Sequence, residues 1–271
     1  MDWNKTKTIF IIAFLVLDTL LVVQFYSKRN SSNYPVIQNT PFEEQLAAEN
    51  ITYIEMPNET EKGSYITAKS HEFTVESVGE LKEQKIIEQD SEKKQSAFLR
   101  IKMEFDKPVP LPESNRQSKL NQLMREKVLS GGDYRYWHQD ESTNSIIYVQ
   151  QYKGKMIFQN QVNSIGMIGL YVNDKNEIYG YEQTMLEDIK EFGEKEETIP
   201  AIKAVEALYN KNYLKSNSDV KEVNYGYYTQ YPLSTQQILA PTWHIVVETS
   251  EEQREDFYVN ALEGDVLQSN N

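Results

Sequence analysis

The sequence has no cysteine and only three histidines, at positions 71, 138 and 244. Without cysteine the chain can form no disulfide framework, no thiol nucleophile and no lipid-modified cysteine anchor. The histidines lie far apart and none occurs in an H-x-x-x-H or H-E-x-x-H pattern. The one H-x-D pair, His138 with Asp140, arises readily by chance in an acidic chain. We therefore predict no metal site and no cofactor.

Basic residues are few relative to acidic ones, with 28 lysines and arginines against 41 aspartates and glutamates and a net charge of −13. Residues 1–29 contain four basic and two acidic side chains, so the remainder carries 24 basic and 39 acidic ones, a net charge of −15. An anionic polymer or an anionic lipid surface would repel such a domain. We therefore expect no nucleic-acid partner.

Several motifs of enzymes are missing as well. The sequence contains no G-x-S-x-G, no P-loop and no G-x-G-x-x-G. Ser91-Glu92-Lys93-Lys94 matches the S-x-x-K motif of penicillin-binding enzymes, but the partner motifs S-D-N and K-T-G are absent. Nothing singles out a pair of carboxylates for glycosidase chemistry. The sequence therefore predicts no catalytic residues, and an enzyme of wall metabolism is the weakest of three hypotheses.

A long apolar run is present near the N-terminus. Residues 8–26 (TIFIIAFLVLDTLLVVQFY) contain one charge, Asp18. A helix of this length, at about 1.5 Å per residue, matches the roughly 30 Å hydrocarbon core of a bilayer. The run is too long for a signal peptide, and no small-residue cleavage pattern follows it before Lys28 and Arg29. We therefore predict a transmembrane helix that is not cleaved.

The flanking basic residues are balanced, so the acidic charge of the large domain decides the predicted orientation. We expect a single-pass protein of the cell membrane of a Gram-positive bacterium, because exported proteins without cysteine are usual there. The predicted segments are a cytoplasmic tail at 1–7, the transmembrane helix at 8–26 and a polar stalk at 27–40. The C-terminal domain is then extracytoplasmic.

Asp18 lies near the middle of the apolar run, where an ionised side chain costs about 2.5 to 3.5 kcal/mol. Thr19 beside it and Gln24 further along add polar surface. Polar groups at this depth usually face other membrane helices, and a tolerated defect in a simple anchor is the alternative. We predict that Asp18, Thr19 and Gln24 contact a membrane-embedded partner helix.

The rest of the chain reads as an α+β protein with antiparallel sheets packed against helices. Thr40, Pro41 and Glu43 are typical of a helix start, and 51–56, 64–68 and 97–105 have the pattern of strands. The charged stretch at 80–95 is expected to be an exposed hairpin or loop. The alternating prolines of 107–112 predict an extended connector and a boundary, which gives an N-terminal α+β portion at 41–111.

Two helix-plus-meander units are predicted to follow, at 112–190 and 191–271. The first helix begins at a Ser114 and Gln117 capping box, and the second opens at Thr198 with Pro200 in its first turn. The first unit has expected strands at 134–138, 144–151, 156–162, 165–173 and 177–185, and the second has them at 220–229, 242–249, 255–260 and 264–268. Because Tyr-Val-Asn precedes a turn both at 171–173 and at 258–260, we interpret the two units as a duplication.

Aromatic residues are frequent, with 18 tyrosines, of which four cluster between 225 and 231. Tyrosine-rich sheets bind sugars or partners by stacking, but most such residues are half-buried strand residues. Trp243 and His244 are neighbours in an apolar strand, so one is expected to face the core and the other solvent or a partner. We favour a structural role for His244.

The N-terminal segment MDWNKTKTIFII and the single span with a mid-membrane acid resemble the YycI (WalI) family. The resemblance extends over the full length and includes Ala240-Pro241-Thr242-Trp243, Tyr258-Val259-Asn260-Ala261 and Gly264-Asp265-Val266, which are also similar to PepSY-like hairpins. It implies a non-catalytic regulator that forms a complex with the membrane protein YycH and the sensor histidine kinase YycG (WalK). Through transmembrane helix contacts this complex adjusts the WalKR cell-wall system. The fold implied is the α+β fold of YycH C-terminal domains.

The leading hypothesis is thus a regulatory scaffold, and the alternative is an extracytoplasmic sensor that binds a cell-wall fragment or a peptide. A broad exposed apolar patch would favour the scaffold, and a deep aromatic-lined groove would favour the sensor. Convergent acids with perturbed pKa values in a cleft would favour the enzyme.

Overall fold

The computed structural model describes residues 3–30, 41–57, 61–88, 97–159, 164–231, 233, 235–251 and 253–267. The chain divides into two compact units, Met1–Gln45 and Leu46–Asn271. The predicted boundaries near 111 and 190 both fall inside the second unit and stay predictions.

The first unit consists mainly of α1 (Trp3–Asn30), a helix of 28 residues without proline or glycine. It contains the predicted span and continues through residues 27–30, which we had expected in the stalk. Residues 31–40, including Thr40 of the predicted capping box, lie outside the described residues. Among the described residues, no helix met the length and apolarity needed for a membrane crossing. The transmembrane assignment of 8–26 therefore stays a prediction.

Four further α-helices and one 3-10 turn are described. They are α2 (Phe42–Ala48), α3 (Val75–Gly79), α4 (Arg116–Lys127), the 3-10 turn η1 (Gly131–Asp133) and α5 (Ala201–Asn210). The predicted capping box at α4 is wrong, because Asn115 occupies the N-cap in a left-handed conformation, φ 51°, without a side-chain hydrogen bond. At α5, Pro200 takes the N-cap, one residue before the first turn in which we had placed it.

The strands dominate the second unit. In chain order they are β1 (Thr52–Tyr53), β2 (Lys62–Ser70), β3 (Phe73–Thr74), β4 (Gln84–Glu88), β5 (Ala97–Phe98), β6 (Ile101–Pro110), β7 (Tyr134–Asp140), β8 (Ser145–Tyr152), β9 (Lys155–Ile157), β10 (Met167–Val172), β11 (Glu177–Gln183), β12 (Leu186–Glu197), β13 (Asp219–Tyr228), β14 (Gln236–Glu248), β15 (Arg254–Asn260) and β16 (Val266–Leu267). All but β3 and β5, which pair with each other, join one large open sheet. The α+β class is therefore confirmed, with sheet as its main component.

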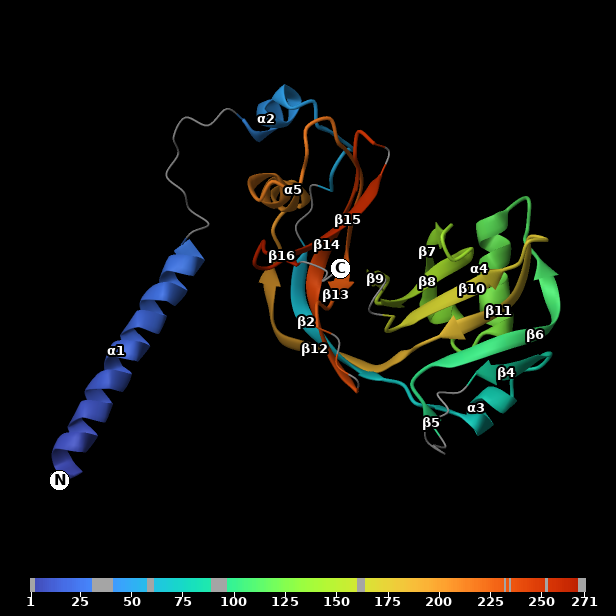
Figure 1. Cartoon of the computed structure of the whole chain (residues 1–271), viewed down its shortest axis with the longest axis horizontal. Coiled ribbons are helices and arrows are strands. Elements are labelled where there is room, and N and C mark those ends of the chain that lie inside the picture. Colours follow the sequence, from blue (N-terminus) through green and yellow to red (C-terminus); the bar gives the residue numbers. More distant parts are fainter. Residues whose placement is uncertain are drawn as a thin grey trace. The chain divides into compact units, whose positions relative to one another are not determined.

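The sheet has two parts, each with its own helix (Figure 1). The α4 sheet contains β4, β6, β11, β10, β8 and β7 in spatial order, and the α5 sheet contains β12, β2, β14 and β13 with β15, β16 and β1 attached. The short strand β9 joins them, because it pairs with β8 on one side and runs parallel to β13 on the other. At this join a Cβ on Gly226 would lie 2.3 Å from the Met156 carbonyl oxygen and 2.5 Å from the Phe158 ring. Only glycine lets the two strands approach so closely.

One face of the α4 sheet forms the larger core. Alternate strand residues such as Ile146, Tyr148 and Leu170 point to this face and are fully buried together with Leu120 and Met124 of α4. The period of two residues then directs Ile147 and Gly169 to the other face. In Figure 1, α4 lies in the same part of the second unit as β8, β10 and β11.

The α5 sheet is covered by α5, whose residues Ala201, Ala204, Val205 and Leu208 are buried. Our expectation that Trp243 and His244 would divide between core and surface is wrong. Both are buried, at 3% and 1% exposure, because β14 lies in the interior of the sheet with covered residues on both faces.

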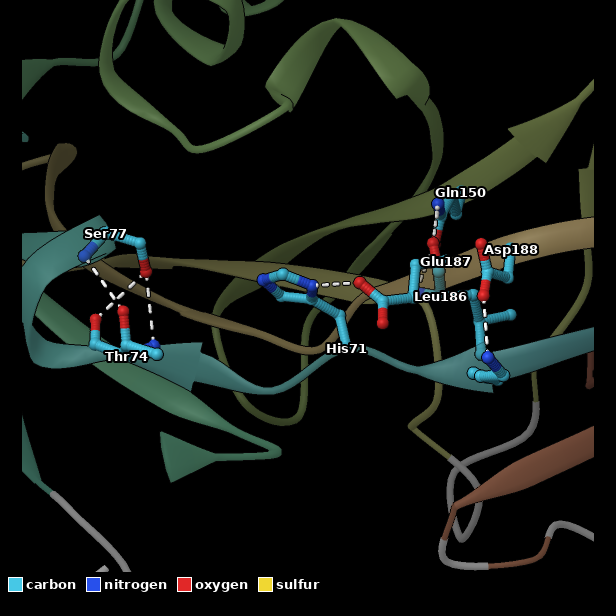
Figure 2. A network of polar contacts seen from close by, with 8 residues as sticks. His71, Thr74, Ser77, Gln150, Leu186, Glu187 and Asp188 are labelled. Carbon is cyan, nitrogen blue, oxygen red and sulfur yellow. Dashed lines mark hydrogen bonds and ion pairs between the residues drawn. The ribbon is translucent and has the colours of Figure 1, made fainter. Parts of the chain in front are cut away.

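The two sheet parts are also linked where β2 leads into β3 and β11 leads into β12. The amide of Gln150 on β8 exchanges two 2.8 Å hydrogen bonds with the backbone of Leu186, and His71 Nδ1 lies 2.5 Å from Glu187 Oε2. Lys69 Nζ pairs with Asp188 at 2.7 Å, and Thr74 with Ser77 forms the capping box of α3. Figure 2 shows these contacts one after another along the segments that connect the two parts of the sheet.

Some predicted segments differ from the structure. The prolines at 108 and 110 are extended, as expected, but they belong to the end of β6, where only β11 pairs with it, rather than to a connector. Part of the expected charged loop is β4, and Ser91 to Lys94 lie outside the described residues. Strand β12 was not predicted at all.

The two Tyr-Val-Asn segments close their hairpins in the same way. The Asn173 side-chain oxygen accepts hydrogen bonds from the backbone of Lys175 and Glu177, and the Asn260 oxygen accepts them from Leu262 and Glu263. Both hairpins thus use an Asx turn. The duplication itself stays a prediction that this likeness supports.

Candidate functional site

The structure places the three predicted contact residues on α1. All three are exposed, and the Thr19 hydroxyl donates a 2.7 Å hydrogen bond to the Leu15 carbonyl. At about 100° per residue, Asp18, Thr19 and Gln24 point in three directions around the helix. They therefore form no single polar stripe, and their role in partner binding stays a prediction.

A second candidate site is a cleft of about 1180 Å³ in the second unit, between the uncovered face of the α4 sheet and strands β15 and β16. Its floor is made by the residues that alternate with the core: Ile147, Met167, Gly169, Tyr171 and Glu182. The same alternation that buries Leu170 under α4 therefore creates the floor of the cleft. Pockets for drug-sized ligands measure about 300–1,000 Å³, so this cleft is large.

Trp137 enters the cleft because β7 contains a β-bulge. Tyr136 pairs with Tyr148 and His138 with Ile147, so Trp137 is an extra residue with no partner on β8. Neighbouring residues of a regular strand face opposite sides, but here both Trp137 and His138 line the cleft. A bulge is a usual means of redirecting a side chain next to a site.

The opposite wall comes from residues 254–258 of β15, among which Arg254, Asp256 and Tyr258 lie on one face of the strand. Asp256 Oδ1 lies 2.6 Å from His244 Nε2, and Arg254 donates two 3.2 Å hydrogen bonds to the same carboxylate. Burial alone would raise the pKa of Asp256, but the hydrogen bonds and charges of His244 and Arg254 outweigh it and lower the pKa. The Asp256 carboxylate is therefore ionised, and both of its oxygens are bonded to His244 or Arg254.

Near the β7–β8 turn, a second carboxylate at the rim of the cleft is also bonded to donors of the protein itself. Asp140 accepts hydrogen bonds from the Ser142 hydroxyl at 2.6 Å, the Ser142 amide and the Thr143 hydroxyl, and these bonds lower its pKa. His138 has its pKa lowered by burial and then by the charge of Arg254, against the opposing effect of Asp256. His138 is thus favoured in its neutral form.

Glu182 on the floor is also paired within the protein. One oxygen of its carboxylate, Oε2, accepts a 2.9 Å hydrogen bond from the Tyr171 hydroxyl. The other, Oε1, lies 2.8 Å from the Arg100 guanidinium in an ion pair. Burial, followed by the charge of Glu182, raises the pKa of Tyr171, which keeps that phenol protonated. The ring of Tyr171 is held in place by these contacts.

The acidic groups and histidines of the cleft bear on the enzyme hypothesis. A glycosidase acid needs a raised pKa, whereas Asp140 and Asp256 both have lowered ones. Within the described ranges no hydroxyl contacts His244 or His138 as a nucleophile would, and no three metal-binding side chains come together.

Sequence reasoning considered His138, Asp140 and His244 but assigned none of them to a site. Trp137, Arg254 and Asp256 were missed, because the bulge and the register between β14 and β15 bring them together. The signals available were the Trp-His pair at 137–138 and the alternation of Arg254, Asp256 and Tyr258. The aromatic-lined groove named for the sensor hypothesis is thus present.

The structure is that of a sheet-rich α+β protein with an apolar N-terminal helix and a large cleft. The YycI protein family model matches residues 30–262, and the chain belongs to the YycI family. This is a regulatory, non-catalytic family associated with the YycFG two-component system.

Two further comparisons add little. No curated protein matches this chain. Among solved structures, an uncharacterized protein from Eubacterium rectale is similar with a TM-score of 0.48 and 10% identity, over 76% of this chain and 86% of that one. A likeness of this degree carries no argument about function.

Proposed function

We propose that this chain is a membrane-anchored regulator in which α1 crosses the cell membrane and contacts the sensor kinase YycG and a YycH-like protein. The observation that carries the proposal is the apolar surface of α1. Phe10, Ile11 and Leu15 are each exposed by more than 60% of their surface, and the other large apolar side chains described between Phe10 and Val23 by more than half. Water does not favour so large an apolar surface, whereas lipid and neighbouring helices do.

The length of α1 supports the same role. A helix of 28 residues is about 42 Å long, enough to pass the roughly 30 Å hydrocarbon core with a short end on each side. The acidic second unit would then lie on the outer side, away from the anionic inner leaflet.

Asp18 is the residue on which we expect the partner contacts to depend. Its exposed carboxyl has no partner among the side chains described for α1, whereas the Thr19 hydroxyl is already bonded to Leu15 within the helix. A polar group of a neighbouring helix would satisfy Asp18, and such bonds contribute roughly 1 kcal/mol in membranes.

The test is co-purification of the tagged full chain with YycG and the YycH-like protein from membranes in mild detergent. Asp18→Leu should lower the recovery of at least one partner about fivefold, which corresponds to about 1 kcal/mol. Thr19→Val, the matched control, should leave recovery within twofold. Equal recovery with Asp18→Leu and the unaltered chain would contradict the role of Asp18.

A second variant tests the helix as a whole. Replacing residues 1–29 by an unrelated membrane anchor should abolish recovery of the kinase. If both partners were still recovered in full, the outer unit alone would hold the complex and the proposed helix contacts would be wrong.

The proposed orientation can be tested by labelling, because the chain has no cysteine of its own. Tyr231 is 70% exposed in the second unit, so Tyr231→Cys introduces a single accessible thiol. A membrane-impermeant maleimide should label it in intact protoplasts. Labelling only after lysis would place the unit in the cytoplasm and contradict the proposal.

A further inference from the structure

The cleft between the α4 sheet and β15 has no part in the proposed function of α1. Aromatic rings and apolar groups line it together with fixed polar groups, and it exceeds the size of pockets for small ligands. Its shape and chemistry therefore call for an extended ligand.

The charges of the cleft favour a neutral ligand. Five carboxylates line the cleft, and four of them have partners within the protein: Asp140, Glu182 and Asp256 are bonded to its donors, and Glu255 forms an ion pair with Lys215. Only the exposed Glu141 at the rim has no described partner, so the cleft offers no group of unpaired carboxylates to a cation. The excess of acidic residues in the chain, 41 against 28 basic ones, repels an anionic polymer. A neutral molecule with many hydrogen-bonding groups is not repelled by the acidic chain and needs no unpaired carboxylate to bind.

The backbone of the floor argues against a peptide. Extended peptides are commonly held by main-chain hydrogen bonds along a free strand edge. The three floor strands are paired on both sides, β8 with β7 and β10, β10 with β8 and β11, and β11 with β10 and β6. The floor therefore offers side chains and ring faces but no free backbone edge.

The ring and polar groups suit sugar units. The bulge directs the half-buried Trp137 ring into the cleft, where it meets the His138 ring edge-on at 4.6 Å between centroids. Asp256 fixes the plane of the Arg254 guanidinium, and Glu182 fixes the Tyr171 hydroxyl. Apolar ring faces pack on the C–H faces of a sugar, while planar polar side chains held in place bond its hydroxyls.

We propose that this cleft binds a neutral oligosaccharide, with Trp137 as the stacking platform and Arg254 as a hydroxyl-binding group. The proposal is independent of Asp18 and of the partner contacts of α1. The two aspartates of the cleft, Asp140 and Asp256, are held ionised by the groups bonded to them, so we expect neither to protonate a bound sugar.

The test uses the full chain in detergent and two probes, the hexamer of β-1,4-linked N-acetylglucosamine and cellohexaose. Calorimetric titration should show saturable binding of at least one probe, and the probe should be recovered unhydrolysed. Trp137→Ala should weaken binding at least tenfold and Trp137→Phe by less, because phenylalanine keeps a ring.

Tyr231→Ala is the matched control, since it removes an exposed aromatic ring that does not line the cleft, and its affinity should stay within twofold. Thermal unfolding of each variant separates loss of the site from loss of the fold, and Trp137→Phe serves if Trp137→Ala does not fold. The proposal is overturned if neither probe binds at millimolar concentration, or if Trp137→Ala and Trp137→Phe both bind as the unaltered chain does. Saturable binding of a neutral hexapeptide in place of both sugars would also overturn it.

Discussion

The two faces of the α4 sheet are built by the same strands but have opposite characters. On β10, Ile168 and Leu170 are fully buried beneath α4, while Met167, Gly169 and Tyr171 line the cleft. One face is covered by a helix of the same unit, and the other combines the apolar Met167 and Ile147 with the hydrogen-bonded pair of Tyr171 and Glu182. A strand with a strict period of two can therefore serve stability on one side and binding on the other.

The largest expected effect tests this division on a single strand. Leu170→Ala should lower the free energy of unfolding by about 2–5 kcal/mol, because it opens a cavity in a fully buried core. Met167→Ala on the cleft face, where the side chain is half-buried, should cost about 1 kcal/mol or less. Urea unfolding of the full chain measures both, and equal losses would show that the two faces do not differ as described.

An intermediate effect is expected where the two sheet parts join. Gly226→Ala places a methyl group against the Met156 carbonyl and the Phe158 ring, so β9 and β13 must separate. We expect a loss of about 1–3 kcal/mol. Gly154→Ala is the control, because it adds the same methyl group where a Cβ meets no atom within 4 Å. The φ of 78° at Gly154 adds some backbone strain but no steric clash. A Gly226→Ala chain that unfolds at the same urea concentration as the unaltered one would contradict the close approach.

The smallest expected effect concerns the wall opposite the floor and depends on pH. The pKa of Asp256 is lower in the folded chain than the value of about 3.9 for an unfolded one, so its ionised form stabilises the fold. This stabilisation is fully present above about pH 4 and is lost as the pH falls towards the folded pKa. Asp256→Asn should therefore cost about 1–2 kcal/mol at pH 7, and the difference should shrink below about pH 4.

Glu255→Gln on the same strand is the control for this prediction. It removes only a 3.6 Å ion pair with Lys215 and should change stability by about 0.5 kcal/mol or less. A difference for Asp256→Asn that stayed constant from pH 7 to pH 3 would show that the ionised carboxylate does not act through His244 and Arg254.

The features that could be predicted from the sequence are those with local causes. The alternation in β8, β10 and β11 and the apolar spacing in α4 and α5 depend on neighbouring residues, and these elements lie where we expected them. The capping pattern of Ser114 misplaced the start of α4, because Asn115 takes the N-cap in the left-handed conformation that asparagine adopts more readily than most residues.

The features that escaped prediction depend on contacts between distant segments. Strand β12 has eight charged residues among twelve and looks like a loop, yet pairing with β2 makes it a strand. His244 meets Asp256 only through the register of β14 on β15, and Trp137 enters the cleft only through the bulge opposite β8. The sequence alone could point to individual residues of the cleft, but it could not show that they lie together.

Strand β12 is paired with β2 along one edge and forms one end of the long sheet. An outer strand of ordinary composition would recruit the same strand of another copy and begin a stack of chains. Here an excess of six acidic over two basic side chains, two breaks in the register and positive φ angles at Asp188 and Gly193 make such stacking unfavourable. At this end the sheet therefore presents charged side chains and an irregular backbone, rather than a regular free edge, to a second copy of the chain.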